Sequence, residues 1–175
     1  MSLLVPGYTP PPLAPCNARS VSCIACDLAS GRAHLPGGRL HQTSHWVVEH
    51  CVGPLGLGTL IVKPGRHVTA VADLNDAEAA ELGPLLRLAT TVAASLVDAD
   101  QVYTCLWSHA GAVPGHVHYV VQPVTAEQVA ETGLYGPALQ MKMFQDNQAP
   151  PEHSVAEVAE RARALFTEVP RSRSC

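Results

Sequence analysis

A long helical pattern lies between two groups of strand patterns, and this order constrains the fold more than any other feature of the chain. Asn75 and Glu78 occupy the N-cap and N3 positions of a capping box. Leucine, valine and alanine then recur at helical spacing, which predicts a helix from about 75 to 98, with a kink near Pro84. Strands on both sides of such a helix predict an α+β domain with a mainly antiparallel sheet.

The strand patterns are four segments rich in β-branched and aromatic residues. They cover 45–52 and 59–63 before the long helix, and 101–107 and 116–122 after it. Three shorter helical patterns follow the last strand and begin near Thr125, Pro137 and Ser154. We therefore expect additional C-terminal helices in the same α+β domain.

Length and composition are those of one domain. The chain has 175 residues, of which 47% are hydrophobic. A proline-rich tail is expected over 1–20, a single domain over 21–170 and a frayed end over 171–175. No apolar run reaches the ~18–20 residues of a membrane span, and the apolar start lacks a basic flank. We therefore expect a cytoplasmic protein with no membrane partner.

The charge of the chain argues against a polymeric nucleic acid as the ligand. The formal net charge is −4, and the sequence contains two lysines, Lys63 and Lys142. Duplex nucleic acid requires a basic stripe that neutralises several phosphates, and the sequence has none. A small nucleotide, held by backbone amides and one or two cations, is compatible with this composition.

Two histidines stand two positions apart in the last strand pattern. Because side chains alternate along a strand, His116 and His118 are expected on one face, about 6.6 Å apart. Histidines on the face of a strand bind metals, transfer protons or act as nucleophiles. A packed histidine with satisfied hydrogen bonds is the structural alternative.

Cys23 and Cys26 form a Cys-x-x-Cys motif. In a secreted protein the six cysteines could form three disulfides, but without a targeting segment a metal site in a reducing cytosol is favoured. A thioredoxin-like redox pair opens a helix after a strand, whereas this motif follows a proline-rich tail; incidental thiols are the third interpretation. Zinc takes four nitrogen or sulfur ligands, so two would come from the nine histidines. Spacing alone does not identify them.

Several motifs resemble those of one known family and occur in the same order. Segment 58–67 resembles a strand and turn ending in a proline, a basic residue and a histidine, and 73–78 resembles the start of the family helix. Segment 116–123 resembles the signature strand, and 23–27 resembles the opening of zinc-containing members. Over about residues 22–124, the chain resembles the histidine triad superfamily of nucleotide hydrolases and transferases.

The resemblance implies a structural zinc ion. In zinc-bearing members, including the galactose-1-phosphate uridylyltransferase branch, the ligands are the Cys-x-x-Cys pair, the histidine after the proline-basic turn and the first signature histidine. The corresponding residues here are Cys23, Cys26, His67 and His116. Alternatively, His67 merely ends a strand and caps the turn.

The resemblance also implies that His118, the middle signature histidine, is catalytic. In the family this residue attacks the α-phosphorus of a nucleotide and forms a nucleotidyl-histidine, which water or an acceptor phosphate then resolves. A neutral imidazole is a competent nucleophile at pH 7. We therefore expect a nucleotide hydrolase or nucleotidyltransferase acting on a phosphate ester, anhydride or phosphoramidate.

The third signature position departs from the family. Val120 stands where hydrolytic members have a histidine and uridylyltransferases have a glutamine. Valine cannot donate to a phosphate, and the loss of such a donor typically costs ~10²–10⁴ in rate. Gln122 lies on the same face, but about 13 Å from His118, so it is not a simple substitute. The alternative function is a catalytically weak or inactive nucleotide-binding or regulatory protein that retains the fold and the zinc.

The loop before the signature strand offers candidates for the missing donor. Ser108 and His109 are candidate supporting residues, with Gln122 as a more distant one. Backbone amides around Gly111 could cradle a phosphate oxygen, although a plain hairpin loop is the alternative. Lys63 is a candidate substrate-binding cation, expected to face solvent. Family members are commonly homodimers, and the leucine-rich helix permits one here.

Overall fold

A five-stranded antiparallel sheet forms the centre of the protein, and the computed structural model describes residues 23–106, 108–110 and 113–168. The sheet has the strand order β1-β2-β3-β7-β4. Its strands are β1 (Arg39–Gln42), β2 (Trp46–His50), β3 (Leu60–Pro64), β4 (Gln101–Leu106) and β7 (Tyr119–Val124). Two short strands, β5 (His109–Ala110) and β6 (Val113–Pro114), pair only with each other in the described part of the chain. The tail expected over 1–20 and the end expected over 171–175 lie outside the described residues.

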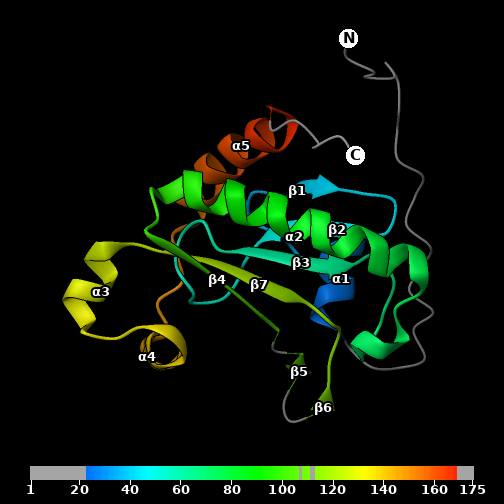
Figure 1. The fold of residues 1–175 in the computed structure, drawn as a ribbon, viewed down its shortest axis with the longest axis horizontal. Helices are drawn as coiled ribbons and strands as arrows, with labels where there is room; N and C mark the ends of the chain where they lie inside the picture. The colour runs from blue at the N-terminus through cyan, green and yellow to red at the C-terminus, as the bar shows by residue number, and fades with distance from the viewer. Residues whose placement is uncertain (1–22, 107, 111–112, 169–175) are drawn as a thin grey trace.

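Five α-helices and one 3₁₀ turn accompany the sheet in the described residues. They are α1 (Ile24–Ser30), η1 (Val71–Asp73), α2 (Asp76–Val97), α3 (Ala126–Thr132), α4 (Gly136–Asp146) and α5 (Glu152–Glu168). Figure 1 shows α2 lying across the sheet, with α5 beside it and with α3 and α4 together at one end. The α+β class, the antiparallel sheet, the long helix and the C-terminal helices predicted from the sequence are confirmed.

The long helix α2 begins with the predicted capping box. The side chain of Asn75 accepts a hydrogen bond from the Glu78 backbone N–H, and the Glu78 carboxylate accepts one from the Asn75 backbone N–H. Pro84 lies inside the helix. By length and composition alone α2 could cross a membrane, but one of its faces packs on the sheet. Leu85, Ala89, Val92, Ala93 and Leu96 share a core there with Leu60, Val62 and Val121.

The two faces of the sheet are covered by different helices. Val62 of β3 and Val121 of β7 belong to the core beneath α2. Because side chains alternate along a strand, the neighbouring Lys63 and Gln122 face the other side. There Lys63 contacts α1 and Gln122 contacts α4. Two of the candidate site residues, Lys63 and Gln122, therefore lie on the face shared by α1 and α4.

The signature segment differs from the prediction in one respect. Strand β7 begins at Tyr119, so His116 and His118 precede the paired strand rather than lying within it. The backbone N–H of Val117 donates instead to the carbonyl of Val68, at 2.7 Å. The segment between the two histidines is thus attached to the turn that follows β3, and His116 lies beside the cysteines at the start of α1.

Candidate metal centre and catalytic histidine

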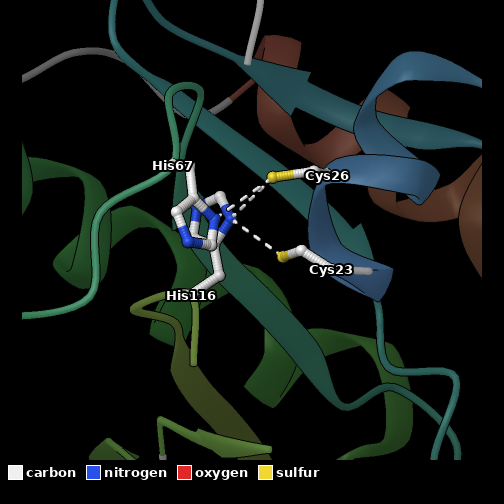
Figure 2. A group of neighbouring side chains, drawn as sticks. All are labelled: Cys23, Cys26, His67 and His116. Carbon is white, nitrogen blue, oxygen red and sulfur yellow. Dashed lines mark hydrogen bonds between the residues drawn. The ribbon is translucent and has the colours of Figure 1, made fainter. Parts of the chain in front are cut away.

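Four side chains from distant parts of the chain meet beside β3. They are Cys23, Cys26, His67 and His116, and their candidate ligand atoms all lie within 4.8 Å of one another. Figure 2 shows the two cysteines projecting from α1 toward the two imidazole rings. The structure therefore brings together all four residues that the resemblance implied as metal ligands.

The separations between the donor atoms fit a tetrahedral zinc ion. The Cys26 sulfur lies 3.3 Å from His67 Nδ1 and 3.5 Å from His116 Nδ1, and the Cys23 sulfur lies 3.8 Å from His116 Nδ1. Tetrahedral zinc, with Zn–S near 2.3 Å and Zn–N near 2.0–2.1 Å, requires S···N separations of about 3.6 Å. Two sulfur and two nitrogen donors are also a common set of ligands for a structural zinc site.

Local structure determines how the ligands reach this point. Cys23 is the N-cap of α1, and the N–H of Asp27 donates to its carbonyl at 2.9 Å. Both cysteines therefore lie at the beginning of the helix, within one turn of each other. His67 follows β3 in a turn, and His116 follows the short β5–β6 hairpin. Three segments of the chain thus converge on one point.

The ring of His116 is oriented by the last residue of β3. Its Nε2 lies 3.0 Å from the carbonyl oxygen of Pro64, which can only accept, so Nε2 carries the proton and Nδ1 presents a lone pair to the cluster. Burial of the ring is the main cause that lowers the pKa of His116 to about 4, and the charge of nearby Lys63 adds to it, although the bond to Pro64 opposes the shift. The neutral imidazole that a metal ligand requires is therefore the stable form.

His118 has the opposite ring orientation. Its Nδ1 lies 2.9 Å from the carbonyl oxygen of His116, so Nδ1 donates and Nε2 bears the lone pair. The side chain is half-buried. His116 thus serves two sites, because its ring faces the cysteines and its carbonyl fixes the tautomer of His118. An imidazole held in this way is suited to nucleophilic attack through Nε2.

Val120 provides only apolar surface at the third signature position. It is 3% exposed and pairs with Ile61 of β3 on one side and Cys105 of β4 on the other. Its side chain offers no hydrogen-bond donor. A donor for a bound phosphate would therefore come from another residue.

Lys63, a predicted substrate-binding residue, and Gln122, a predicted supporting residue, both form hydrogen bonds inside the protein. Lys63 is 1% exposed, and its ammonium donates to Glu49 and to the carbonyl of Ala25, so the expectation that it faces solvent is wrong. Gln122 is fully buried and donates to the carbonyl of Leu55. This correction removes both side chains from the candidate phosphate contacts.

The structure does not test the roles predicted for the three candidate residues in the loop before β7. Ser108 is half-buried, and its carbonyl accepts a hydrogen bond from the N–H of Gly115, which closes the β5–β6 hairpin. His109 lies in β5, but its side chain is outside the described part of the structure, as is Gly111. The roles predicted for Ser108, His109 and Gly111 stay predictions.

Two polar residues with clear contacts were missed by the sequence reasoning. Glu49 is buried against Lys63, and Gln140 of α4 donates to Gln122 at 2.9 Å. Glu49 has a detectable signal, since a carboxylate follows three consecutive apolar residues in the middle of a strand pattern. Gln140 has no such signal, because the docking of α4 on the sheet depends on the tertiary structure.

Comparison with known proteins supports one fold. No protein-family profile and no curated protein sequence matches the chain. A zinc-bound histidine triad family protein from Mycobacterium smegmatis matches with a TM-score of 0.61 and 18% identity, over 85% of this chain and 95% of its own. The chain has the histidine triad fold. A hypothetical histidine triad nucleotide-binding protein from Sulfolobus tokodaii matches with a TM-score of 0.64 and 15% identity, over 84% of this chain and 93% of its own.

A third histidine triad protein matches only part of this chain. A member of this family from Bacillus subtilis is covered over 100% of its length, but over only 75% of this chain, with a TM-score of 0.54 and 16% identity. The match therefore spans that protein from end to end and leaves about a quarter of this chain outside it. The predicted resemblance to the histidine triad superfamily is confirmed at the level of the fold.

Proposed function

We propose that this protein is a nucleotide hydrolase or nucleotidyltransferase in which His118 is the nucleophile. The observation that carries the proposal is the hydrogen bond from His118 Nδ1 to the His116 carbonyl, which leaves Nε2 unprotonated. The nucleotide-binding description of the Sulfolobus tokodaii protein supports a small nucleotide as the partner. The substrate class is a nucleoside phosphate ester, anhydride or phosphoramidate.

The proposed reaction has two displacements at phosphorus. The Nε2 lone pair forms a bond to the α-phosphorus, and the bond from phosphorus to the leaving group breaks with its electron pair. The positive charge that develops on the ring is stabilised by the His116 carbonyl through the Nδ1 proton. Water or an acceptor phosphate then attacks the same phosphorus and releases Nε2 with its lone pair restored.

We propose that the Cys23, Cys26, His67 and His116 cluster holds a structural zinc ion. Thiolate and imidazole donors at the separations described above suit this metal. Bound zinc would supply a rigid link between α1, the turn after β3 and the segment before β7. His118 lies two residues from His116, so this link would also restrict the backbone that carries the nucleophile.

We also propose a single cytoplasmic domain over residues 21–170 that assembles as a homodimer. Strand β4 is at the edge of the five-stranded sheet, with no strand on its outer side among the described residues. An unpaired edge strand is a ready surface for a second chain. The long helix α2 also contacts β4.

A second candidate function is favoured by Val120. Because this buried valine replaces the third signature histidine, the protein could bind a nucleotide and regulate a partner without turning the nucleotide over. Under this alternative, nucleotides bind to the folded protein, but no mononucleotide is released. The two candidates therefore differ in one measurable product.

The test uses purified protein that contains one zinc ion per chain. Adenosine phosphoramidate, a diadenosine polyphosphate and a nucleotide sugar are supplied, and release of the mononucleotide is followed. We expect release by the wild-type protein, none by His118→Ala with its zinc retained, and a loss of about 10²–10⁴ for Ser108→Ala if this residue donates to the phosphate. Equal release by wild type and His118→Ala would refute the proposal, and binding without release would favour the second function.

A further inference from the structure

Lys63 is a buried cation that the proposed reaction does not use. It is the fourth residue of β3 and lies on the sheet face covered by α1. Its ammonium donates to a Glu49 carboxylate oxygen at 2.5 Å and to the carbonyl of Ala25 at 2.8 Å. Ala25 stands between Cys23 and Cys26, so this contact reaches the centre of the Cys-x-x-Cys motif.

The last two residues of β3 therefore contact both the cysteine segment and one histidine of the candidate metal cluster. The Lys63 side chain holds the segment that carries the two cysteines, and the Pro64 carbonyl accepts from His116 Nε2 at 3.0 Å. Neither contact requires a metal ion. The cluster thus has hydrogen bonds of its own, on the segment that carries the cysteines and on the ring of His116.

We propose that Lys63, paired with Glu49, is a positioning residue that holds the Cys-x-x-Cys helix in its metal-binding orientation before zinc binds. This inference rests on the proposed zinc site. A free ligand loop loses conformational entropy when it closes on a metal, so a tether that orders it in advance raises the affinity. Contacts that orient metal ligands are typically worth 10–100-fold in metal affinity.

The burial of the Lys63–Glu49 pair favours a role in positioning α1 over a role in stabilising the fold. Both side chains are at most 2% exposed, and the second carboxylate oxygen of Glu49 has no hydrogen-bond partner among the described residues. Burying two charges is costly, and an apolar pair of similar size is often as stable or more so. What an apolar pair cannot do is donate a hydrogen bond to the Ala25 carbonyl.

The experiment compares two variants. Lys63→Met/Glu49→Leu removes the tether and leaves no unpaired buried charge, so it should fold. Arg39→Ala is the matched control, because Arg39 also donates from a guanidinium to a carbonyl of α1, that of Ala29, but at the other end of the helix and from an exposed position. Zinc affinity is measured by competition with a chelator of known affinity, and folding by circular dichroism.

We expect the double variant to bind zinc 10–100-fold more weakly than wild type, and Arg39→Ala to bind it as wild type does. Val92→Ala, in the core on the α2 side of the sheet, controls for general destabilisation. It should lower the midpoint of unfolding while zinc affinity stays unchanged. A folded double variant with wild-type zinc affinity would overturn the inference.

A second readout needs no zinc. In metal-free protein, Cys23 and Cys26 should react with a thiol reagent faster in the double variant than in wild type or Arg39→Ala, as followed by mass spectrometry. Suppose that wild type bound no zinc but this difference in thiol reactivity appeared. The proposed zinc site would then be refuted, and the proposed role of Lys63 in positioning α1 would be supported. If the double variant does not fold, the positioning role is tested instead by amide hydrogen exchange of the metal-free wild-type protein. Protection of α1 is expected, and its absence would overturn the tether.

Discussion

At the scale of single residues, His116 connects the two chemical parts of the molecule. Its ring is fixed by the Pro64 carbonyl and faces the cysteines, while its own carbonyl accepts the Nδ1 proton of His118. The same backbone segment therefore determines both the metal ligand and the tautomer of the candidate nucleophile. A change in the position of His116 would alter both.

Val120 is predicted to contribute packing but no chemistry. Val120→Ala should lower the free energy of unfolding by about 1–3 kcal/mol, because it leaves a cavity between Ile61 and Cys105. Mononucleotide release per folded molecule should stay close to wild type, since valine donates to nothing. Urea denaturation and the release assay measure the two effects. Loss of release in a fully folded Val120→Ala protein would contradict this assignment.

At the scale of elements, β3 organises the site. Its side chains contact α1 on one face of the sheet and α2 on the other, and its last carbonyl orients His116. The loop that leads into β3 is held in turn by His50 of β2. The imidazole Nε2 of His50 accepts from the Gly58 N–H at 3.0 Å, and Nδ1 donates to the Cys51 carbonyl at 2.8 Å.

His50 should make the protein less stable in mild acid. Burial lowers the pKa of His50 below its ordinary value of 6.5, although the bond to Cys51 opposes the shift. Its contribution to stability is therefore complete above about pH 6.5 and declines as the pH falls below that value, because the unfolded state binds the proton more readily. A protonated ring would also place two donors, Nε2–H and the Gly58 N–H, against each other.

The measurement is urea denaturation at pH 7.5 and at pH 5.5. Wild type should lose more stability between these values than His50→Gln, which has no imidazole to protonate. The difference between the two proteins isolates His50 from the other histidines. An equal loss in both would show that His50 does not contribute to the pH dependence.

Gly37 is predicted to be essential for the packing of α5. Its φ is +73°, and a Cβ added there would lie 2.6 Å from the Cβ of Ala159. Gly37→Ala should destabilise the protein by about 1–3 kcal/mol through backbone strain, with the steric clash adding to this. Gly38→Ala is the control, since φ is +68° but the space around it is open. Equal effects of the two substitutions in urea denaturation would contradict the role of the contact with α5.

Elements that are specified by neighbouring residues could be predicted from the sequence. Contacts between residues far apart in the chain could not. The capping box places the start of α2 within a few residues, so its prediction was accurate. The predicted strand began at His116, but β7 begins at Tyr119. The start depends on where pairing with β3 begins, which the residues of this segment do not reveal. The burial of Lys63 was missed for the same reason, since Glu49 and Ala25 come from other elements.

At the scale of the whole molecule, the candidate metal cluster links parts of the chain that are far apart in sequence. Its ligands come from α1, from the turn after β3 and from the segment before β7. The motifs identified these residues only through a family resemblance, because spacing does not reveal which histidines meet. The fold is what brings them within reach of one another.

Removal of zinc should therefore destabilise the whole protein. A ligand that binds only the folded state adds about 2.7 kcal/mol at a concentration 100 times its Kd. A chelator should lower the midpoint of thermal unfolding of wild type, and added zinc should restore it. Cys23→Ser, as the control, should unfold at a lower temperature and respond weakly to either treatment. Wild type that loses its zinc without any change in the midpoint would contradict a structural role.

The central claim is that His118 Nε2 forms a covalent bond to the nucleotide, and trapping of that adduct tests it most directly. Protein mixed with a diadenosine polyphosphate is quenched within milliseconds to seconds in alkaline denaturant, and intact mass spectrometry follows. We predict an increase equal to one adenylyl group, located on His118 by peptide mapping and absent from His118→Ala. Release of mononucleotide with no adduct on His118 at any quench time, or an adduct on another residue, would contradict the account.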